Sequence, residues 1–379
     1  MPDTTSRRRF LGHGAGVLGL LAASGRLGRA QGSAQASAEP LITKAVAFLK
    51  PRQGDDGGWS TQREPGITAL VVTALLRSRQ VGPGEPVVTK ALGYLEQFIN
   101  PNGVSDKLPH SNYSVAIALL AFQEAESRAP GRYKALVKTG QDFLKGKQWD
   151  ESEGKGKDSD FYGGAGYGGS NSRPDLSNTA FMMEALRDTG LPADDPALQK
   201  ALVFVSRCQN LKSEFNDRPW AGKVNDGGFV YTAANGGQSM AGGKGDDVGG
   251  LRSYASMTYA GLKSMIYAGL KEDDPRVKAA VDYIRKHYAV DENPGLGQAG
   301  LYYYYQTFAK ALALLGKPTL VDDKGTSHDW RADLIGALAK RQNPDGSWVN
   351  KADRFMEGDP NLVTSYGLLA LAYARPKAP

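Results

Sequence analysis

Apolar residues recur along this chain in two alternating helical patterns. One kind of segment is apolar on a single face, as at Leu41, Ala45, Phe48 and Leu49, and it ends in a glutamine and a glycine-rich turn. The other kind is apolar on nearly all sides, which is typical of a buried helix. We expect six buried helices, at residues 67–76, 113–122, 176–186, 254–266, 301–315 and 362–373.

The polar turns repeat with the helices. A glutamine precedes such a turn at Gln53 and Gln342. Further copies are Gln148 before Trp149 and Gln209 before Asn210, with weaker ones at 100–103 and 291–295. Six pairs of an amphipathic and a buried helix close most simply into a two-layer ring with the buried helices inside. We therefore predict an all-α fold, an (α/α)6 toroid, in a single domain over residues 37–379. An open solenoid of the same pairs is the alternative, because periodicity fixes stacking but not closure.

Two long glycine-rich segments, residues 150–173 and 211–253, interrupt the third and fourth units between the outer and the inner helix. Segments of this length inside a compact domain are usually functional loops or disordered. We expect both loops at the same end of the ring.

The N-terminal segment differs from the rest. The run Ser6-Arg7-Arg8-Arg9-Phe10-Leu11, a weakly apolar stretch at 12–23 and Ala34-Gln35-Ala36 together resemble a twin-arginine export signal. The resemblance implies that residues 1–36 are removed and that the protein is periplasmic or extracellular; the alternative is a basic tail. The apolar stretch is too short to span a bilayer, although contact with a membrane surface stays open.

Charge supports the same division. The first 36 residues hold five arginines and one aspartate, so they carry most of the net charge of +6. Without them the chain is nearly neutral, and we therefore expect no nucleic-acid partner.

The segments Gln53 to Trp59 and Gln342 to Trp348 resemble the QW motifs of the prenyltransferase and squalene oxidase repeat family, which includes squalene-hopene cyclases and protein prenyltransferase β subunits. Two close copies and four looser ones cover nearly all of residues 37–379. The resemblance implies a central cavity that handles isoprenoids. We expect the glutamine to bond backbone at a helix end and the tryptophan to pack over the neighbouring repeat.

The run Asp175-Leu176-Ser177-Asn178-Thr179-Ala180 resembles the D-x-D-D-T-A motif with which class II terpene cyclases deliver the first proton. Ser177 and Asn178 stand where the two later carboxylates belong, including the usual donor, so the acid chemistry of the family is in doubt here. The candidate catalytic residues are Asp175, Asp246 and Asp247. The alternatives are a helix N-cap for Asp175 and a solvated loop for the aspartate pair.

Zinc chemistry of the prenyltransferase kind is not expected. Val363 occupies the position of the family's zinc histidine. We expect the lone Cys208 to be a small buried residue at the end of an outer helix. His110, His287 and His328 lie in different units without the spacing of metal ligands. We predict no metal and no cofactor.

Aromatic and threonine side chains near the starts of the buried helices are the candidate cavity lining: Thr179, Phe181, Tyr254, Tyr259, Tyr302, Tyr305 and Tyr366. Tyr113 and the rest of the run Tyr302 to Tyr305 belong to the same aromatic cluster. They suit an apolar ligand with a few polar groups or a carbocation, and they would equally fill the ring as core.

Our leading hypothesis is an exported protein that binds an isoprenoid or similar apolar molecule, with cyclisation or isomerisation left open. A non-catalytic binding scaffold and a carbohydrate-active lyase or hydrolase, using Asp226 or Asp247 with Tyr254, are the alternatives.

Overall fold

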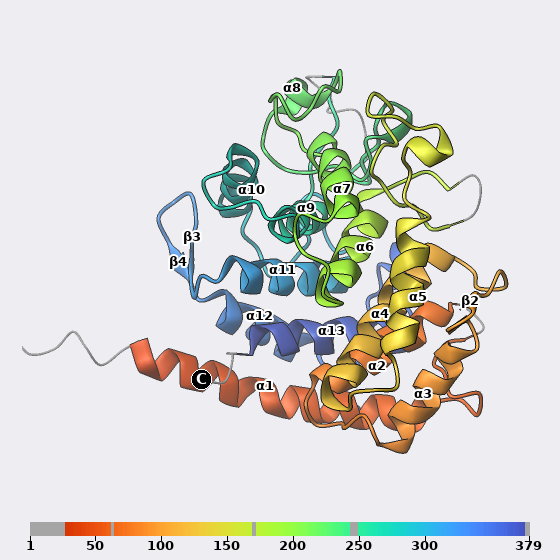
Figure 1. Ribbon diagram of the computed structural model, residues 1–379. Coiled ribbons are helices and arrows are strands. Elements are labelled where there is room, and N and C mark those ends of the chain that lie inside the picture. Colours follow the sequence, from red (N-terminus) through yellow and green to blue (C-terminus); the bar gives the residue numbers. More distant parts are fainter. Residues whose placement is uncertain (1–26, 62–63, 169–171, 243–248, 376–379) are drawn as a thin grey trace, which may run out of the picture.

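The computed structural model describes residues 27–61, 64–168, 172–242 and 249–375, which form two concentric layers of helices (Figure 1). The outer helices are α1 (Leu27–Leu49), α3 (Pro86–Glu96), α5 (Lys134–Lys145), α7 (Pro196–Arg207), α10 (Pro275–Lys286) and α12 (Trp330–Arg341). The inner helices are α2 (Pro65–Arg77), α4 (Ser111–Arg128), α6 (Leu176–Asp188), α9 (Ala255–Tyr267), α11 (Leu301–Leu315) and α13 (Pro360–Ala374). All six predicted buried helices are present, with ends that differ by a few residues.

Small elements fill the connections. Two hairpins follow α3 and α11, formed by β1 (Ile99–Asn100) with β2 (Gly103–Val104) and by β3 (Leu320–Val321) with β4 (Ser327–His328). A single-turn helix, α8 (Ala221–Val224), lies in the loop before α9.

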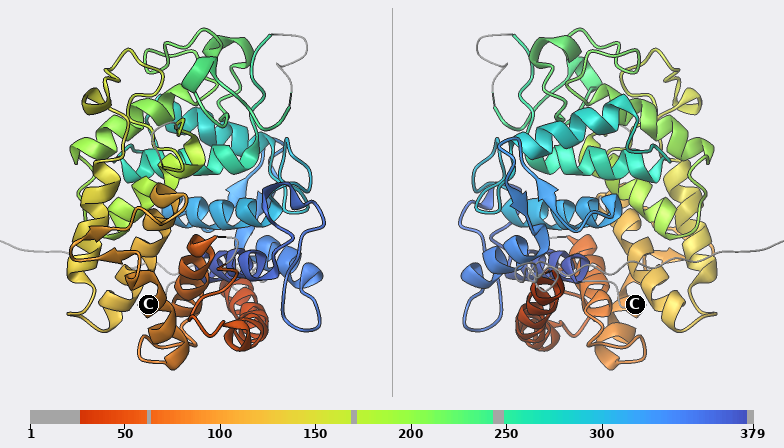
Figure 2. Two further views of the ribbon diagram at one scale, coloured as in Figure 1. Left: turned by 90° about the vertical axis from the view of Figure 1, so that its right-hand side faces the viewer. Right: turned by 90° about the vertical axis from the view of Figure 1, so that its left-hand side faces the viewer.

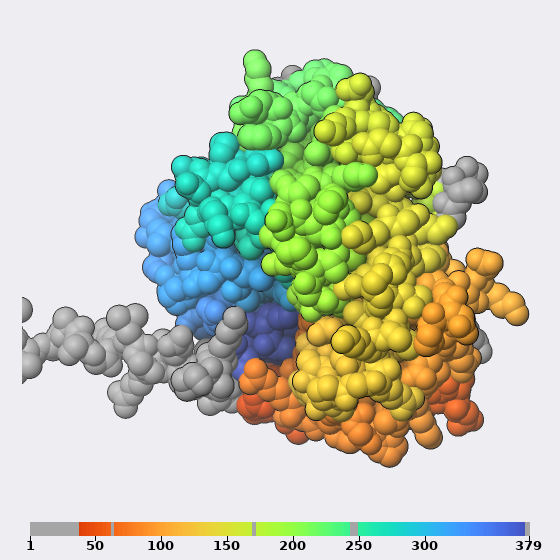
Figure 3. Space-filling view, in the orientation of Figure 1, coloured from red at the N-terminus to blue at the C-terminus, as the bar shows by residue number. Residues whose placement is uncertain are grey.

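The inner helices form a closed ring. Each packs against the next in chain order, and α13 packs against α2 to complete the circle. Figures 1 and 2 show the last unit lying beside α1, and Figure 3 shows successive units side by side on the outer surface. The prediction of an (α/α)6 toroid is confirmed, and the open solenoid is wrong.

The recurrence of the glutamine turns along the chain has a simple structural basis. Gln53 Nε2 donates to the carbonyl of Gly57 in its own turn and to that of Val87, the residue after the proline that begins the next outer helix, both at 2.8 Å. The same pair of acceptors serves the other turns: Gly163 and Ala197 for Gln148, Gly227 and Arg276 for Gln209, and Gly346 and Leu41 for Gln342. Because Leu41 belongs to α1, the last of these bonds links the two ends of the ring.

The tryptophans act within their own units. Trp59 Nε1 donates to Leu49 O at the end of α1, and its backbone N–H donates to Thr68 Oγ1 on α2. Trp348 repeats both bonds with Leu338 and Thr364. Each indole N–H therefore satisfies an end carbonyl of its own outer helix, and the glutamine makes the hydrogen bond to the next unit. That the tryptophan rings pack over the neighbouring repeat stays a prediction.

Glycine is required where each turn meets the next outer helix. At Gly163 the φ angle is +80°, and a Cβ atom would lie 1.8 Å from Lys200 O on α7. Gly57, Gly227 and Gly346 show the same conflict with the next outer helix. Any larger residue would force the two units apart.

Both long inserts lie at the end of the ring where the inner helices begin, as predicted. The start of α6 joins them, because Asp175 N–H donates to Ala165 O of the first insert and Leu176 N–H donates to Tyr231 O of the second. Residues Asp246 and Asp247 of the second insert lie outside the described residues.

The structure describes only the last part of the predicted N-terminal signal, from residue 27. The arginine motif lies outside the described residues, and α1 spans the expected boundary at residue 36. Across the described ranges, no helix combines the length and the apolar character that crossing a bilayer requires.

Candidate functional site

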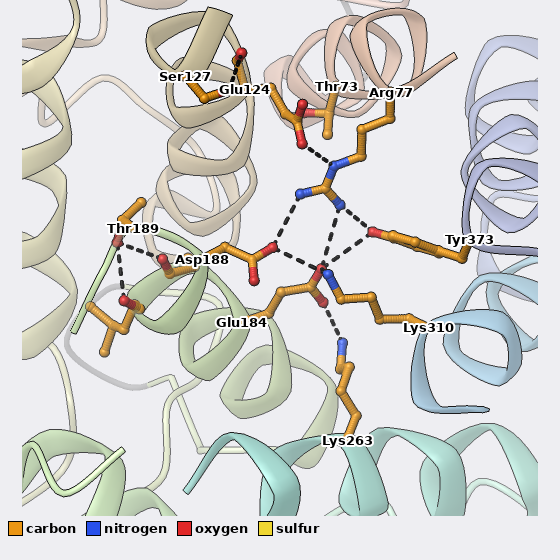
Figure 4. A network of polar contacts seen from close by, with 12 residues as sticks. Thr73, Arg77, Glu124, Ser127, Glu184, Asp188, Thr189, Lys263, Lys310 and Tyr373 are labelled. Atoms are coloured by element: carbon orange, nitrogen blue, oxygen red, sulfur yellow. Dashed lines mark hydrogen bonds and ion pairs between the residues drawn. The ribbon is translucent and has the colours of Figure 1, made fainter. Parts of the chain in front are cut away.

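A buried polar network fills the ring where the inner helices end (Figure 4). Every inner helix contributes to it, and we call the set the polar plug: Arg77, Glu124, Glu184, Asp188, Lys263, Lys310 and Tyr373. Three cations thus face three carboxylates. The charges balance, which is the condition under which buried ions are tolerated.

Glu184 is the centre of the plug. It is fully buried and lies 2.5 Å from Lys263 Nζ and 3.4 Å from Lys310 Nζ. Burial alone would raise the pKa of Glu184, but Lys263, Lys310 and Arg77 hold it well below its usual range. The carboxylate is therefore ionised, and this end of the ring is closed by paired charge rather than by apolar side chains.

Above the plug, four aromatic side chains meet across the ring. Phe181 lies 5.4 Å from Tyr113 and 6.2 Å from Tyr303 between ring centroids, and Tyr366 lies 6.0 Å from Tyr303. The hydroxyls of Tyr113 and Tyr366 are 3.4 Å apart, which completes the circle. These four residues, from α4, α6, α11 and α13, form what we call the aromatic floor. Lys263 Nζ lies 5.5 Å from the Phe181 ring and so joins the floor to the plug.

The floor is partly open to solvent and uncharged. Tyr113 and Tyr303 are half-buried, whereas Phe181 and Tyr366 are buried. Burial raises the pKa of Tyr113, Tyr303 and Tyr366 well above the usual tyrosine range, so their hydroxyls stay neutral. The floor thus offers aromatic faces with a few neutral hydroxyls, including that of Tyr303, which lies 3.0 Å from Ser177 Oγ.

Asp175 lies beside the floor as the N-cap of α6, which confirms the structural alternative considered for it. Its carboxylate accepts from the backbone N–H of Asn178 at 2.9 Å and from Asn178 Nδ2 at 2.7 Å. Burial raises the pKa of Asp175 to about 6, against the opposing effect of bonds from Asn178 and Tyr231. A carboxyl with that pKa can exchange protons near neutral pH, so capping and proton transfer are compatible.

A second carboxylate lies at the same end of the ring. Glu64, 6% exposed, caps α2 through Gly66 N–H and accepts from Ser114 Oγ at 2.8 Å. Its other oxygen binds Nδ1 of His110. The imidazole is more than half exposed and lies edge-on to Tyr167, whose ring also contacts Tyr113 of the floor. A pocket of about 280 Å³ opens beside His110.

The predicted lining residues divide into two groups. Phe181 and Tyr366 belong to the floor. Tyr254 is the buried N-cap of α9, and burial raises the pKa of its hydroxyl. The others lie elsewhere. Tyr259 packs on Tyr304 and Phe308, Tyr302 packs on Tyr305, Tyr305 donates to Val290 O, and Thr179 bonds the backbone of Ala165 and Asp175.

The sequence did not single out several residues of the site, and Tyr303 was expected only as one member of the run Tyr302 to Tyr305. Tyr303 contacts Phe181 and Tyr366, whereas its neighbours Tyr302, Tyr304 and Tyr305 lie elsewhere. Because this helix is apolar on all sides, its sequence pattern does not indicate which of the four tyrosines points to the centre of the ring. Tyr167 and Tyr231 come from the inserts, whose position depends on tertiary contacts. The plug residues carried a usable signal, because a charge inside an otherwise apolar helix needs a buried partner.

Asp226, considered for carbohydrate chemistry, is a turn residue. It accepts from Gly228 N–H and from Ser253 Oγ. Asp56 accepts from Gly58 N–H at the corresponding place in the first unit. Cys208 is the buried C-cap of α7, as expected. The described ranges bring no three His, Cys, Asp or Glu side chains into an arrangement that could hold a metal ion.

Comparison with known proteins finds solved structures with a similar fold. No family model and no curated protein matches the chain. The type II terpene cyclase MstE from Scytonema, in complex with geranylgeranyl dihydroxybenzoate, superposes with a TM-score of 0.53 at 14% identity, over 91% of this chain and 99% of the cyclase. Its complex with merosterolic acid A gives a TM-score of 0.52 at 14% identity, with the same coverage of both chains.

A protein from Actinoplanes is similar to the same degree, with a TM-score of 0.51 and 16% identity over 89% of this chain and 100% of that one. At such identities the likeness concerns the fold, which is a helical ring like that of the terpene cyclases.

Proposed function

We propose that this protein binds an isoprenoid or a similarly apolar molecule on the aromatic floor. The observation that carries the proposal is the floor itself, where three neutral tyrosines and Phe181 meet towards the end of the ring at which the inner helices begin, with Tyr113 and Tyr303 partly exposed, while the other end is closed by charge. Aromatic faces of this kind recognise extended apolar groups. MstE, which shares the fold, binds geranylgeranyl dihydroxybenzoate as substrate and merosterolic acid A as product.

Within the described part of the chain, Asp175 is our candidate for the group that starts an isomerisation or cyclisation. Ser177 and Asn178 cannot donate a proton to a double bond at neutral pH, whereas Asp175 is a carboxyl whose pKa burial raises to about 6. A raised pKa means a more tightly held proton. Asp175 is therefore a poor acid for an isolated alkene, and a double-bond shift by proton shuttling would require a ligand whose C–H bond is acidified by a neighbouring carbonyl group. Asp246 and Asp247 stay predictions for the same role.

We also propose export by the twin-arginine route, on the strength of the motif at residues 6–11. Export would place the binding site in the periplasm or outside the cell.

Binding is tested with the purified chain and geranylgeraniol, by equilibrium titration and by analysis of extracted products. We expect saturable binding that Tyr303→Ala weakens and that Tyr288→Ala leaves unchanged, because Tyr288 is a half-buried aromatic stacked on His328, away from the floor. Asp175→Asn should bind the probe and abolish any conversion.

Absence of saturable binding to a panel of polyprenols and triterpenes would refute the proposal. Binding without conversion would identify the non-catalytic scaffold. Binding of oligosaccharides in place of isoprenoids would favour the carbohydrate alternative.

A further inference from the structure

The contacts of His110 bear on the polar end of the ligand. His110 precedes α4 in the left-handed backbone conformation, with φ at 44° and ψ at 45°. A non-glycine residue in this region is uncommon, although histidine is enriched there. The conformation turns Nδ1 inward to Glu64 and leaves the rest of the ring, 56% of the side chain, exposed. The backbone thus holds the imidazole against a buried carboxylate.

Glu64 determines which ring nitrogen carries the proton. Both oxygens of the carboxylate act as acceptors, Oε1 for Gly66 N–H and Ser114 Oγ and Oε2 for His110. An ionised carboxylate has no proton to offer, so Nδ1 must be the donor. In a neutral imidazole the other nitrogen, Nε2, then presents a lone pair. Nε2 has no hydrogen-bond partner within the part of the chain that the structure describes.

The surroundings of His110 connect this lone pair to the aromatic floor. The imidazole meets Tyr167, whose ring lies 5.9 Å from Tyr113 of the floor. His110 also lines the pocket of about 280 Å³, whose other polar lining residues are Ser105, Asp106, Ser111 and Lys147. A molecule lying on the floor could therefore extend one end past Tyr167 to His110.

From these contacts we propose that the ligand is an isoprenoid alcohol or phenol whose hydroxyl group donates a hydrogen bond to His110 Nε2. The inference rests on the proposed function and narrows it, because it assigns a polar donor to one end of the apolar molecule. Glu64 is a positioning residue in this arrangement, and His110 selects hydroxyl-bearing ligands over ethers and hydrocarbons.

The first test requires no ligand. Nitrogen-15 NMR of the histidines at about pH 8.5, above the range in which histidine ordinarily titrates, reports which nitrogen is protonated, and His110→Asn assigns the signal. We expect a proton on Nδ1 and none on Nε2. A proton on Nε2 in the wild-type protein overturns the inference.

Glu64→Gln sharpens the test. Gly66 N–H and the Ser114 hydroxyl require an acceptor at the Oε1 position, so the glutamine must place its NH2 group opposite His110. His110 Nδ1 then becomes the acceptor, and the proton moves to Nε2. The variant should show the opposite tautomer. An unchanged tautomer would show that Glu64 does not control the ring.

The second test compares geranylgeraniol with its methyl ether, which differ in one donor. The wild-type protein should prefer the alcohol by about threefold to tenfold, the effect of one hydrogen bond. His110→Asn retains a donor to Glu64 but lacks the outer nitrogen, and both it and Glu64→Gln should bind the two probes equally. Equal binding by the wild type, or a preference that survives His110→Asn, refutes the inference while the proposed function stands. Binding of neither probe refutes both.

Discussion

Replacement of Glu184 by glutamine probes the polar plug most sharply. The wild-type carboxylate is fully buried and pairs with Lys263, which is 1% exposed, and with Lys310 and Arg77 at 3.4 Å and 3.8 Å. Glutamine keeps the shape but removes the charge, so the Lys263 ammonium stays buried without a counter-charge. Breaking a buried ion pair in this way costs about 3 to 5 kcal/mol. We expect the free energy of unfolding to fall by that amount.

The charge count predicts a rescue. In the double variant Glu184→Gln/Lys263→Met, Arg77 and Lys310 still face Glu124 and Asp188, so two cations meet two carboxylates. We expect the double variant to recover to within about 1 kcal/mol of the wild type, because replacing both members of a buried pair is often nearly neutral.

Urea unfolding followed by circular dichroism at neutral pH measures both variants. Asp142→Asn is the control, because Asp142 pairs with Lys138 on the surface, where the two side chains are 60% and 68% exposed, and its loss should cost less than about 1 kcal/mol. The reasoning fails if Glu184→Gln costs no more than this control. It fails equally if the double variant loses as much free energy of unfolding as the single variants Glu184→Gln and Lys263→Met lose together.

Three further predictions concern the turns, the cap and the leader. Gly163→Ala should cost more than about 3 kcal/mol, since its Cβ would strike Lys200 O, whereas Gly190→Ala, with φ at +101° and open space around it, should cost only about 1 to 2 kcal/mol of backbone strain; thermal and urea unfolding compare the two. The pKa of Asp175 is raised from 3.8 to about 6, so its contribution to stability is lost as pH rises through 6. Asp175→Asn keeps a capping side chain, so its free energy of unfolding should exceed that of the wild type by about 1 to 3 kcal/mol at pH 8 and differ little from it at pH 4. A variant that is no more stable than the wild type at pH 8 would contradict the raised pKa of Asp175. Replacing Arg7 and Arg8 by lysine should abolish export, measured by fractionation of cells, and undiminished export would exclude the twin-arginine route.

Much of the architecture could be predicted because the ring is periodic. Glutamine, glycine and threonine recur at fixed places, and each makes the same contact in every unit that has it. Thr68 and Thr364, for example, accept a hydrogen bond from the backbone N–H of Trp59 and Trp348. The linking role of the glutamine needed the structure, since its second acceptor, such as Val87 for Gln53, lies in the next unit.

The candidate site was harder to predict. Asp175 was identified correctly as a residue at the start of an inner helix, but its buried position depends on two inserts whose folding has no local signal. In the run Tyr302 to Tyr305 only contacts between distant helices decide that Tyr303 meets Phe181 and Tyr366. The His110 contact with Glu64 joins two loops 46 residues apart in sequence, and neither loop carries a recognisable motif.

Photo-crosslinking tests the central claim most directly. A geranylgeraniol analogue with a diazirine near the middle of its chain is bound to the protein, irradiated and located by mass spectrometry of the peptides. The account predicts crosslinks at the floor, on peptides containing Tyr113, Tyr303 and Tyr366, and their displacement by unlabelled geranylgeraniol. Crosslinks confined to the outer helices, or undisplaced by the competitor, would contradict it.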